Sequence, residues 1–121
     1  MSIKIGTRAS KLALVQTETV MTKLSALGIS SEKIIINTLG DSTTQVPLHA
    51  IGGQGVFVRA LDDAILAGEI DCAVHSMKDI PAYRPHGLFT AAVLKRDSPA
   101  DYIAHNGSLD KVAIIGTSST R

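Results

Sequence analysis

The sequence predicts an α/β fold, with a largely parallel sheet flanked by helices. Short runs of β-branched residues alternate with longer segments whose apolar residues recur at helical spacing. The resulting order, strand–helix–strand–helix–strand, requires crossover connections that place successive strands parallel to one another. A hydrophobic content of 45% and a charged content of 19% suit a packed domain of this class.

The first predicted strand and helix lie at the N-terminus. Ile3–Thr7 is β-prone, and a helical pattern follows it between Ser10, a suitable N-cap, and Gly28, a suitable stop. The pattern consists of apolar residues that fall near one face at 3.6-residue spacing: Leu12, Val15, Val20, Leu24 and Leu27. Such spacing is typical of a helix with one apolar face.

The middle of the chain carries the next two strands and the second helix. Three consecutive isoleucines within Lys33–Leu39 predict a strand that is buried on both faces. Val56–Ala67 predicts a helix that ends at Gly68. Its inward side chains are expected to be Phe57, Leu61, Ala64 and Ile65. A third strand is expected before Lys78.

Two more apolar runs, Leu88–Leu94 and Val112–Ile115, are further strand candidates. Between them, the charged and proline-containing segment Lys95–Pro99 predicts a segment boundary or hinge. The chain stops at Arg121, directly after a pattern typical of a strand-to-helix turn. Because a complete domain seldom ends there, we expect this sequence to be a fragment.

Composition argues against several classes of protein. The net charge is +1, aromatic residues make up 3% and tryptophan is absent, so nucleic-acid binding is not expected. No apolar run approaches the length of a membrane span, and the N-terminus resembles neither a signal peptide nor a transit peptide. The single cysteine, Cys72, lies in an apolar run and is expected to be a buried structural thiol. These observations predict a soluble protein of the reducing cytoplasm.

The stretch Asp71–Pro81 is the strongest candidate for a site. It predicts a short buried strand that delivers the adjacent charges of Lys78 and Asp79 into a tight turn. In open α/β sheets, ligands bind outside the carboxyl ends of the strands. Asp79 is suited to exchange protons with a substrate, and Lys78 to hold an anion beside it. The alternative is a surface turn whose charges meet water.

Three turns share one design, in which an apolar strand is followed by small hydroxyl residues and a basic residue. They are Gly6–Ser10, Ser76–Asp79 and Gly116–Arg121. Helix-start N–H groups, hydroxyls and a guanidinium together make an anion site, and the planar fork of arginine suits a carboxylate. If all three turns face one cleft, the ligand carries several carboxylates or phosphates. Taken singly, each turn also fits an ordinary helix N-terminus with an exposed base nearby.

Other candidates are weaker. Gly52–Gly55 lacks the spacing of a nucleotide-binding loop and is interpreted as a mobile glycine loop. Asp41 is either a turn former or a second carboxylate of the site. The four histidines show no ligand spacing, so no metal is expected, and His75 is interpreted as a hydrogen-bonded structural residue. Met77 is interpreted as a core residue.

Five pieces of the chain, taken in order, resemble a known family. They are Gly6–Leu14, Thr38–Asp41, Ile51–Phe57, Ala73–Pro81 and Gly116–Arg121. In this combination, and above all in the run Val-His-Ser-Met-Lys-Asp, the chain resembles the porphobilinogen deaminases, also called hydroxymethylbilane synthases. The resemblance spans essentially the whole chain.

The resemblance implies a three-domain, typically monomeric enzyme whose first two domains look like the lobes of a type II periplasmic binding protein. Residues 1–97 would form most of domain 1, and residues 98–121 the hinge and the opening of domain 2. The rest of domain 2 and domain 3 would be absent from the chain. The family joins four porphobilinogen units head to tail, releasing ammonia at each step, in tetrapyrrole and heme biosynthesis. The growing polypyrrole chain is held on a covalently attached dipyrromethane cofactor.

The resemblance also implies roles for single residues. Asp79 matches the catalytic carboxylate. Asp41 matches a loop aspartate near the cofactor, and Gly52–Gly55 match part of a mobile loop over the cleft. The positions that match residues binding the acetate and propionate side chains of cofactor and substrate are Arg8, Ser10, Lys78, Thr117, Ser119 and Arg121.

The chain also departs from the family pattern. The cysteine that carries the dipyrromethane belongs to the third domain, and Cys72 does not match it. Ala50 and Gln54 stand where some relatives have lysine, which leaves the contribution of this loop to anion binding open. The chain alone is therefore expected to be inactive. The competing function is a lobe that only binds anions or carboxylates. Asp79 distinguishes this function from a deaminase, because a simple anion receptor gains nothing from a carboxylate beside Lys78.

Overall fold

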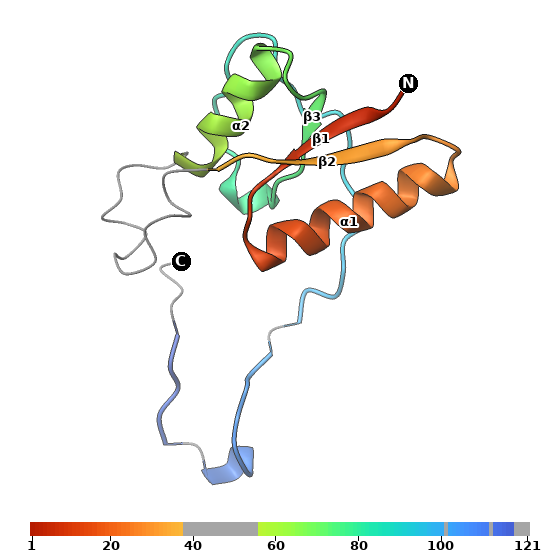
Figure 1. Cartoon of the computed structure of the whole chain (residues 1–121). Coiled ribbons are helices and arrows are strands. Elements are labelled where there is room, and N and C mark those ends of the chain that lie inside the picture. Colours follow the sequence, from red (N-terminus) through yellow and green to blue (C-terminus); the bar gives the residue numbers. More distant parts are fainter. Residues whose placement is uncertain (38–55, 101, 112, 118–121) are drawn as a thin grey trace. The chain divides into compact units, whose positions relative to one another are not determined.

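The computed structural model describes residues 1–37, 56–100, 102–111 and 113–117. The chain divides into two compact units, Met1–Thr90 and Ala91–Arg121. Every strand and α-helix within these described residues belongs to the first unit (Figure 1).

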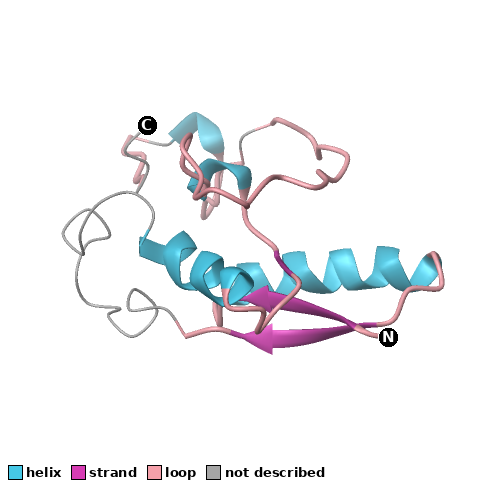
Figure 2. Ribbon diagram, turned by 90° about the horizontal axis from the view of Figure 1, so that it is seen from above, coloured by secondary structure: helices cyan, strands magenta, loops and turns pink. Residues whose placement is uncertain are grey.

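A three-stranded parallel sheet forms the centre of the first unit. Its strands run in the same direction (Figure 2) and take the order β2-β1-β3, so that β1 lies between the other two. Their bounds are Ile3–Thr7 for β1, Ser31–Ile35 for β2 and Cys72–Ala73 for β3. The predicted α/β class and the parallel pairing are confirmed over the described residues.

Asp71 stabilises the start of the β1–β3 pair through both its side chain and its backbone. The Asp71 carboxylate accepts a 2.8 Å hydrogen bond from the Lys4 N–H, and the Asp71 N–H donates to the Lys4 carbonyl at 2.9 Å. This reciprocal contact brings together residues 67 positions apart in the chain.

Helix α1 (Lys11–Ala26) begins and ends where the sequence indicates. The Ser10 Oγ accepts a 3.4 Å hydrogen bond from the Ala13 N–H and so caps the first turn. Gly28 follows the last turn at a φ of +75°, a left-handed conformation that favours glycine.

The apolar face of α1 is only partly buried. Leu12, Val15 and Leu27 are all more than half exposed, whereas Thr17 is fully buried and donates its hydroxyl to the Ala13 carbonyl at 2.9 Å. The helix packs on β1 and β2, two strands of five residues each. A contact surface this short covers only part of a 16-residue helix.

Helix α2 (Val56–Leu66) lies on the opposite side of the sheet from α1 (Figure 1) and packs on β1 and β3. Leu61 and Ala64 are buried and Ile65 partly so, as predicted, while the side chain of Phe57 lies outside the description. The core on this side consists of Leu61, Ala64 and Ile70, with Ile34, Ile36, Ile65 and Ala73 packed against it.

The strand predicted over Lys33–Leu39 differs from the observed β2. It begins two residues earlier and ends at Ile35, which is 51% exposed. Only one side of the strand, carrying Ile34 and Ile36, packs partly buried against the core cluster. The expected burial on both faces is therefore wrong for the described residues, because β2 is the edge strand and α2 and α1 do not enclose it fully.

The second unit has little regular structure. Over its described residues it holds one 3-10 turn, η3 (Leu109–Lys111), and no strand. The strands predicted over Leu88–Leu94, which crosses the boundary between the units, and over Val112–Ile115 are wrong where the chain is described. Phe89 of the first unit and Ile114 of the second are 82% and 88% exposed. A strand needs a neighbour for its N–H and C=O groups, and no described segment pairs with either run.

None of the helices in the described ranges is long and apolar enough to cross a membrane. The predicted division at residues 97 and 98 stays a prediction.

Candidate functional site

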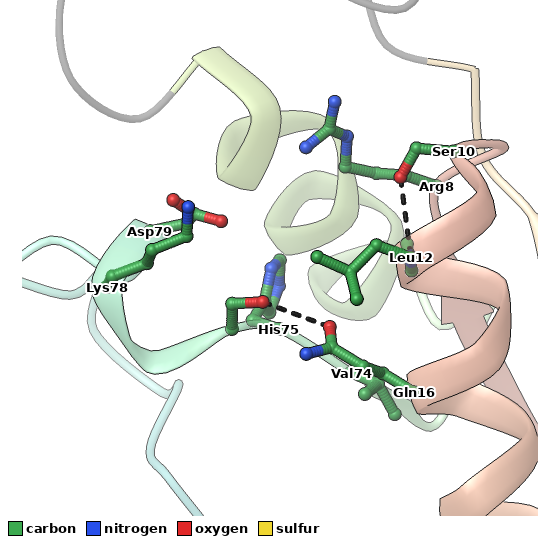
Figure 3. A pocket seen from close by; sticks show the side chains of 10 residues that line it. Arg8, Ser10, Leu12, Gln16, Val74, His75, Lys78 and Asp79 are labelled. Atoms are coloured by element: carbon green, nitrogen blue, oxygen red, sulfur yellow. Dashed lines mark hydrogen bonds between the residues drawn. The ribbon is translucent and has the colours of Figure 1, made fainter. Parts of the chain in front are cut away.

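A pocket of about 130 Å³ opens at the carboxyl ends of β1 and β3 (Figure 3). Because these strands are parallel neighbours, the residues that follow them reach the same edge of the sheet. The pocket is smaller than the roughly 300–1,000 Å³ of a typical ligand pocket, so it has room for part of a ligand. Its polar lining consists of Arg8, Ser10, Gln16, His75, Ser76, Lys78 and Asp79.

One wall comes from the turn between β1 and α1. Thr7, the last residue of β1, is fully buried, which fixes the direction in which Arg8 leaves the sheet. Ser10 caps α1 through its Oγ and lines the pocket from the helix start. In Figure 3 the Arg8 side chain and the Asp79 carboxylate lie on opposite sides of the same space. This wall thus presents a guanidinium and a hydroxyl.

The other wall comes from η2 (Met77–Asp79), a 3-10 turn that follows β3. The Asp79 N–H donates to the Ser76 carbonyl at 2.9 Å, which closes the turn and carries Lys78 and Asp79 to the pocket. Met77 is 60% exposed, so its assignment to the core is wrong: with three residues per turn, the side chains of Met77, Lys78 and Asp79 leave the 3-10 turn in three different directions.

A side-chain hydrogen bond joins the two walls. The Ser76 Oγ donates to the Gln16 Oε1 at 3.0 Å, across 60 positions of the sequence (Figure 3). Gln16 was not anticipated as a site residue. Its signal is positional, since it follows Leu12 by four residues and so extends the pocket-lining face of α1.

His75 lies at the back of the pocket between the two walls (Figure 3). Its Nε2 is fully buried and has no hydrogen-bond partner in the part of the chain that is described. The interpretation of His75 as a hydrogen-bonded residue is therefore wrong for this atom. Burial is the largest effect and lowers the pKa of the imidazole from its ordinary 6.5. The negative charges of Asp62 and Asp79 raise this pKa, and the positive charges of Arg84 and Arg8 lower it.

A buried ion pair stands close enough to His75 to influence its charge. The Arg84 Nη2 lies 2.6 Å from the Asp62 Oδ1, and the two side chains are only 20% and 5% exposed. The sequence pattern did not single out this pair. A signal exists for Asp62, which follows the buried Val58 by four residues on α2 and adjoins the buried Leu61.

Cys72 lies on β3, outside the residues that line the pocket. It is half-buried, and burial, with a smaller contribution from the Asp71 charge, raises the pKa of its thiol from 9.0. The expected burial of Cys72 is therefore only partial, whereas its place outside the pocket lining agrees with a structural thiol.

The structure brings together four of the eight predicted site residues: Arg8, Ser10, Lys78 and Asp79. Thr117 belongs to the second unit. The other predicted site and loop residues lie outside the described part of the chain: Asp41, Ala50, Gly52–Gly55, Ser119 and Arg121.

The arrangement combines opposite charges with neutral hydrogen-bonding groups. The two cations, Arg8 and Lys78, suit a ligand carboxylate, and arginine can bind both of its oxygens. Asp79 can accept hydrogen bonds from ligand N–H groups, stabilise a cation or take up a proton. Within the described residues, no group of three or more histidine, cysteine or acidic side chains is placed to hold a metal ion.

The sequence matches one protein-family model, described as porphobilinogen deaminase, dipyromethane cofactor binding domain, over residues 3–121. Similar proteins include a probable porphobilinogen deaminase of Methanosarcina acetivorans, 57% identical over 97% of this chain and 39% of the relative. Another probable porphobilinogen deaminase, from Archaeoglobus fulgidus, is 47% identical over 100% of this chain and 43% of the relative. The porphobilinogen deaminase of Geobacter sulfurreducens is 44% identical over 98% of this chain and 39% of the relative.

The chain thus spans about two fifths of the length of the curated relatives it matches. The family match extends from β1 through both walls of the pocket to the last residue. The chain belongs to the porphobilinogen deaminase family.

Proposed function

We propose that this chain is part of a hydroxymethylbilane synthase, a transferase that condenses four porphobilinogen units head to tail and releases ammonia. The observation that carries the proposal is the pocket, in which Asp79 lies with the cations Arg8 and Lys78 at the ends of two parallel strands. Porphobilinogen offers each of them a partner. It has two carboxylates for the cations, and a pyrrole N–H and an aminomethyl group for Asp79.

In this proposal, Arg8, Ser10 and Lys78 hold acetate and propionate side chains. Arg8 binds one carboxylate through two N–H groups, and Lys78 adds a point charge from the other wall. The Ser10 hydroxyl donates to a ligand oxygen while its Oγ still accepts from the Ala13 N–H. These contacts fix the position of the ring relative to Asp79.

Asp79 is the proposed catalytic carboxylate. When the C–N bond of the protonated aminomethyl group breaks, ammonia leaves with the bonding electrons and the positive charge stays on the ring. The Asp79 carboxylate stabilises that charge and holds the pyrrole N–H. After a neighbouring pyrrole has formed the new C–C bond, a proton must leave its ring carbon, and Asp79 is the proposed group that accepts it.

The lining of the pocket also fits the carboxylates of a dipyrromethane. Arg8 and Lys78 are the groups that would hold them, although a volume of about 130 Å³ accommodates part of such a group rather than the whole. When bound, the dipyrromethane supplies the pyrrole end to which the first unit is joined. Further contacts are proposed for residues that match the family positions: Asp41, Thr117, Ser119 and Arg121.

The proposal includes the setting of the site. The described α/β unit would be one lobe of a type II periplasmic-binding-protein-like pair, with residues 1–97 in domain 1 and residues 98–121 opening domain 2. The whole protein would be a cytoplasmic monomer that uses porphobilinogen and the growing polypyrrole chain as its ligands and binds neither nucleic acid nor membrane. The low aromatic content and the net charge of +1 support the last point.

The test is Asp79→Asn in the full-length protein. The substitution keeps the size of the side chain and removes its negative charge. We expect kcat to fall by roughly a hundredfold or more, as is typical for loss of a positioned proton-transfer or cation-stabilising group. Porphobilinogen consumption and ammonia release would be measured together.

The matched control is Asp63→Asn, because Asp63 is exposed on α2 and does not line the pocket. It should leave turnover within about twofold, as expected for a surface substitution. Near wild-type turnover in Asp79→Asn would remove the catalytic role and favour a lobe that only binds carboxylates.

A further inference from the structure

Ser76 contacts both the helix on one side of the pocket and the acidic turn on the other. Its Oγ donates to the Gln16 Oε1 of α1 at 3.0 Å, and its carbonyl accepts the Asp79 N–H at 2.9 Å. Two consecutive hydrogen bonds therefore lead from α1 to the residue that carries the proposed catalytic carboxylate. Because Gln16 and Ser76 lie 60 positions apart in the chain, folding is needed to bring them together.

The Ser76 hydroxyl is not used for the local role that is usual at such a position. Ser76 directly precedes η2, where a serine commonly caps the following turn through its Oγ. Its Oγ makes no capping hydrogen bond to η2, and its backbone is extended at a φ of −68° and a ψ of 130°. The hydroxyl reaches across to α1 instead. The contact therefore supports the pocket rather than the turn itself.

The sheet holds this segment only as far as Val74. Strand β3 ends at Ala73, and in the described part of the chain the last backbone hydrogen bond from this segment to β1 runs from the Val74 N–H to the Gly6 carbonyl at 3.2 Å. Two residues later, Ser76 makes its contact with α1. This contact thus lies just past the end of the β-ladder, where it fixes the direction in which η2 leaves the sheet.

The position of η2 matters because the two walls carry different groups of the site. Arg8 comes from the wall that leads into α1, and Asp79 from η2. A carboxylate that stabilises a ring cation must lie close to the ring that Arg8 holds, and a displacement of about 1 Å can cost roughly a hundredfold in rate. Met77 and Lys78, the first two residues of η2, are exposed, so packing contributes little to holding the turn.

We propose that Gln16 and Ser76 are positioning residues, and that their hydrogen bond holds the Asp79 turn against α1 so that the carboxylate meets a ring bound by Arg8. This inference rests on the proposed role of Asp79. Both residues then affect kcat through Asp79, without contact to the reacting atoms.

Ser76→Ala and Gln16→Met each remove one partner of the bond. Methionine matches glutamine in length, flexibility and helix propensity, so Gln16→Met should preserve α1. We expect each variant of the full-length protein to lose about tenfold in kcat, because the carboxylate is held less firmly. KM should change by less than about threefold, because Arg8 and Ser10 keep their places on the other wall. Ser76→Thr keeps the hydroxyl, suits the extended backbone and should restore most of kcat.

The double variant tests whether the two residues act through their bond. If they do, Ser76→Ala/Gln16→Met loses no more than the larger single loss, whereas independent effects multiply. Losses that multiply would overturn the proposal and favour a direct contact of Gln16 with the ligand. The matched control is Thr19→Ala, because the Thr19 hydroxyl donates to the Val15 carbonyl within α1 at 3.0 Å and Thr19 does not line the pocket. It should leave kcat within about twofold.

A last pair of variants separates positioning from general damage to the fold. In Asp79→Asn no carboxylate remains to be positioned, so adding Ser76→Ala should lower the residual rate of ammonia release by no more than about twofold. A further tenfold drop would show that Ser76 supports the fold, and would overturn the proposal. Wild-type kcat in both Ser76→Ala and Gln16→Met would also overturn it, and a low turnover in Asp79→Asn would then still support the proposed function.

Discussion

Arg8 obtains its place from its neighbours in the chain. Ile5 and Thr7 are fully buried on β1, and Ser10 is fixed by its bond to the first turn of α1. The backbone on both sides of Arg8 is therefore held, so its guanidinium extends from a fixed point at the edge of the sheet. This suits a planar group that must meet a carboxylate edge to edge.

Arg8→Lys is accordingly expected to impair the enzyme although the charge is kept. Lysine cannot form the bidentate contact, so we expect at least a tenfold loss in kcat/KM of the full-length protein, with fewer rings bound per molecule in intact mass spectra. Arg59→Lys, on the exposed part of α2, is the control. A normal distribution of bound rings in Arg8→Lys would remove this residue from the site.

Cys72 should react slowly despite being the only thiol. Its raised pKa keeps the thiol protonated well above neutral pH, and half of the side chain is shielded on β3. At pH 8, we expect iodoacetamide to alkylate the folded chain at least about tenfold more slowly than the chain in urea. Equal rates in the two states, followed by intact mass, would contradict this position for Cys72.

At the scale of the elements, local chemistry predicts helices better than strands. The caps of α1 and the inward residues of α2 follow from the spacing of apolar residues and from Ser10, Gly28 and Gly68. Strands depend on partners distant in sequence, so the apolar run Leu88–Leu94 has strand composition without strand structure.

The candidate site shows the same division. The turns that hold Arg8 and Asp79 were predictable, because each comes shortly after a strand within an apolar run. The contacts between Gln16 and Ser76 and between Asp62 and Arg84 were not, because each joins segments whose approach is set by packing rather than by local pattern.

Gly6 lies on β1 directly against the core side chains of Ile70 and Leu61. A Cβ at this position would overlap the Ile70 side chain and come within 3.0 Å of the Leu61 Cδ2. We expect Gly6→Ala to lower the free energy of unfolding by about 1–3 kcal/mol, the usual cost of overpacking a core. Urea unfolding measures this cost. Gly116→Ala, where a Cβ meets nothing within 4 Å, is the control, and equal losses in both would contradict the close contact.

At the scale of the whole chain, the two units should differ in resistance to protease. The described residues of Ala91–Arg121 are exposed and include one short 3-10 turn. Trypsin should therefore cut first after Lys95 or Arg96, well before Lys23 in helix α1. Mass spectrometry of early digests tests this order. The variant Lys95→Gln/Arg96→Gln should slow the first cut, and early cleavage at Lys23 would contradict the prediction.

The central position of β1 also has a consequence for synthesis on the ribosome. Of the three strands described, β1 is made before β2 and β3 and needs a partner on both sides; Asp71, which pairs with Lys4, follows that residue by 67 positions. At a synthesis rate of roughly 5–20 residues per second, one edge of β1 stays unpaired for on the order of several seconds, until β3 has been made. During that interval the nascent chain offers an open β-edge, a surface that can pair with other chains and aggregate.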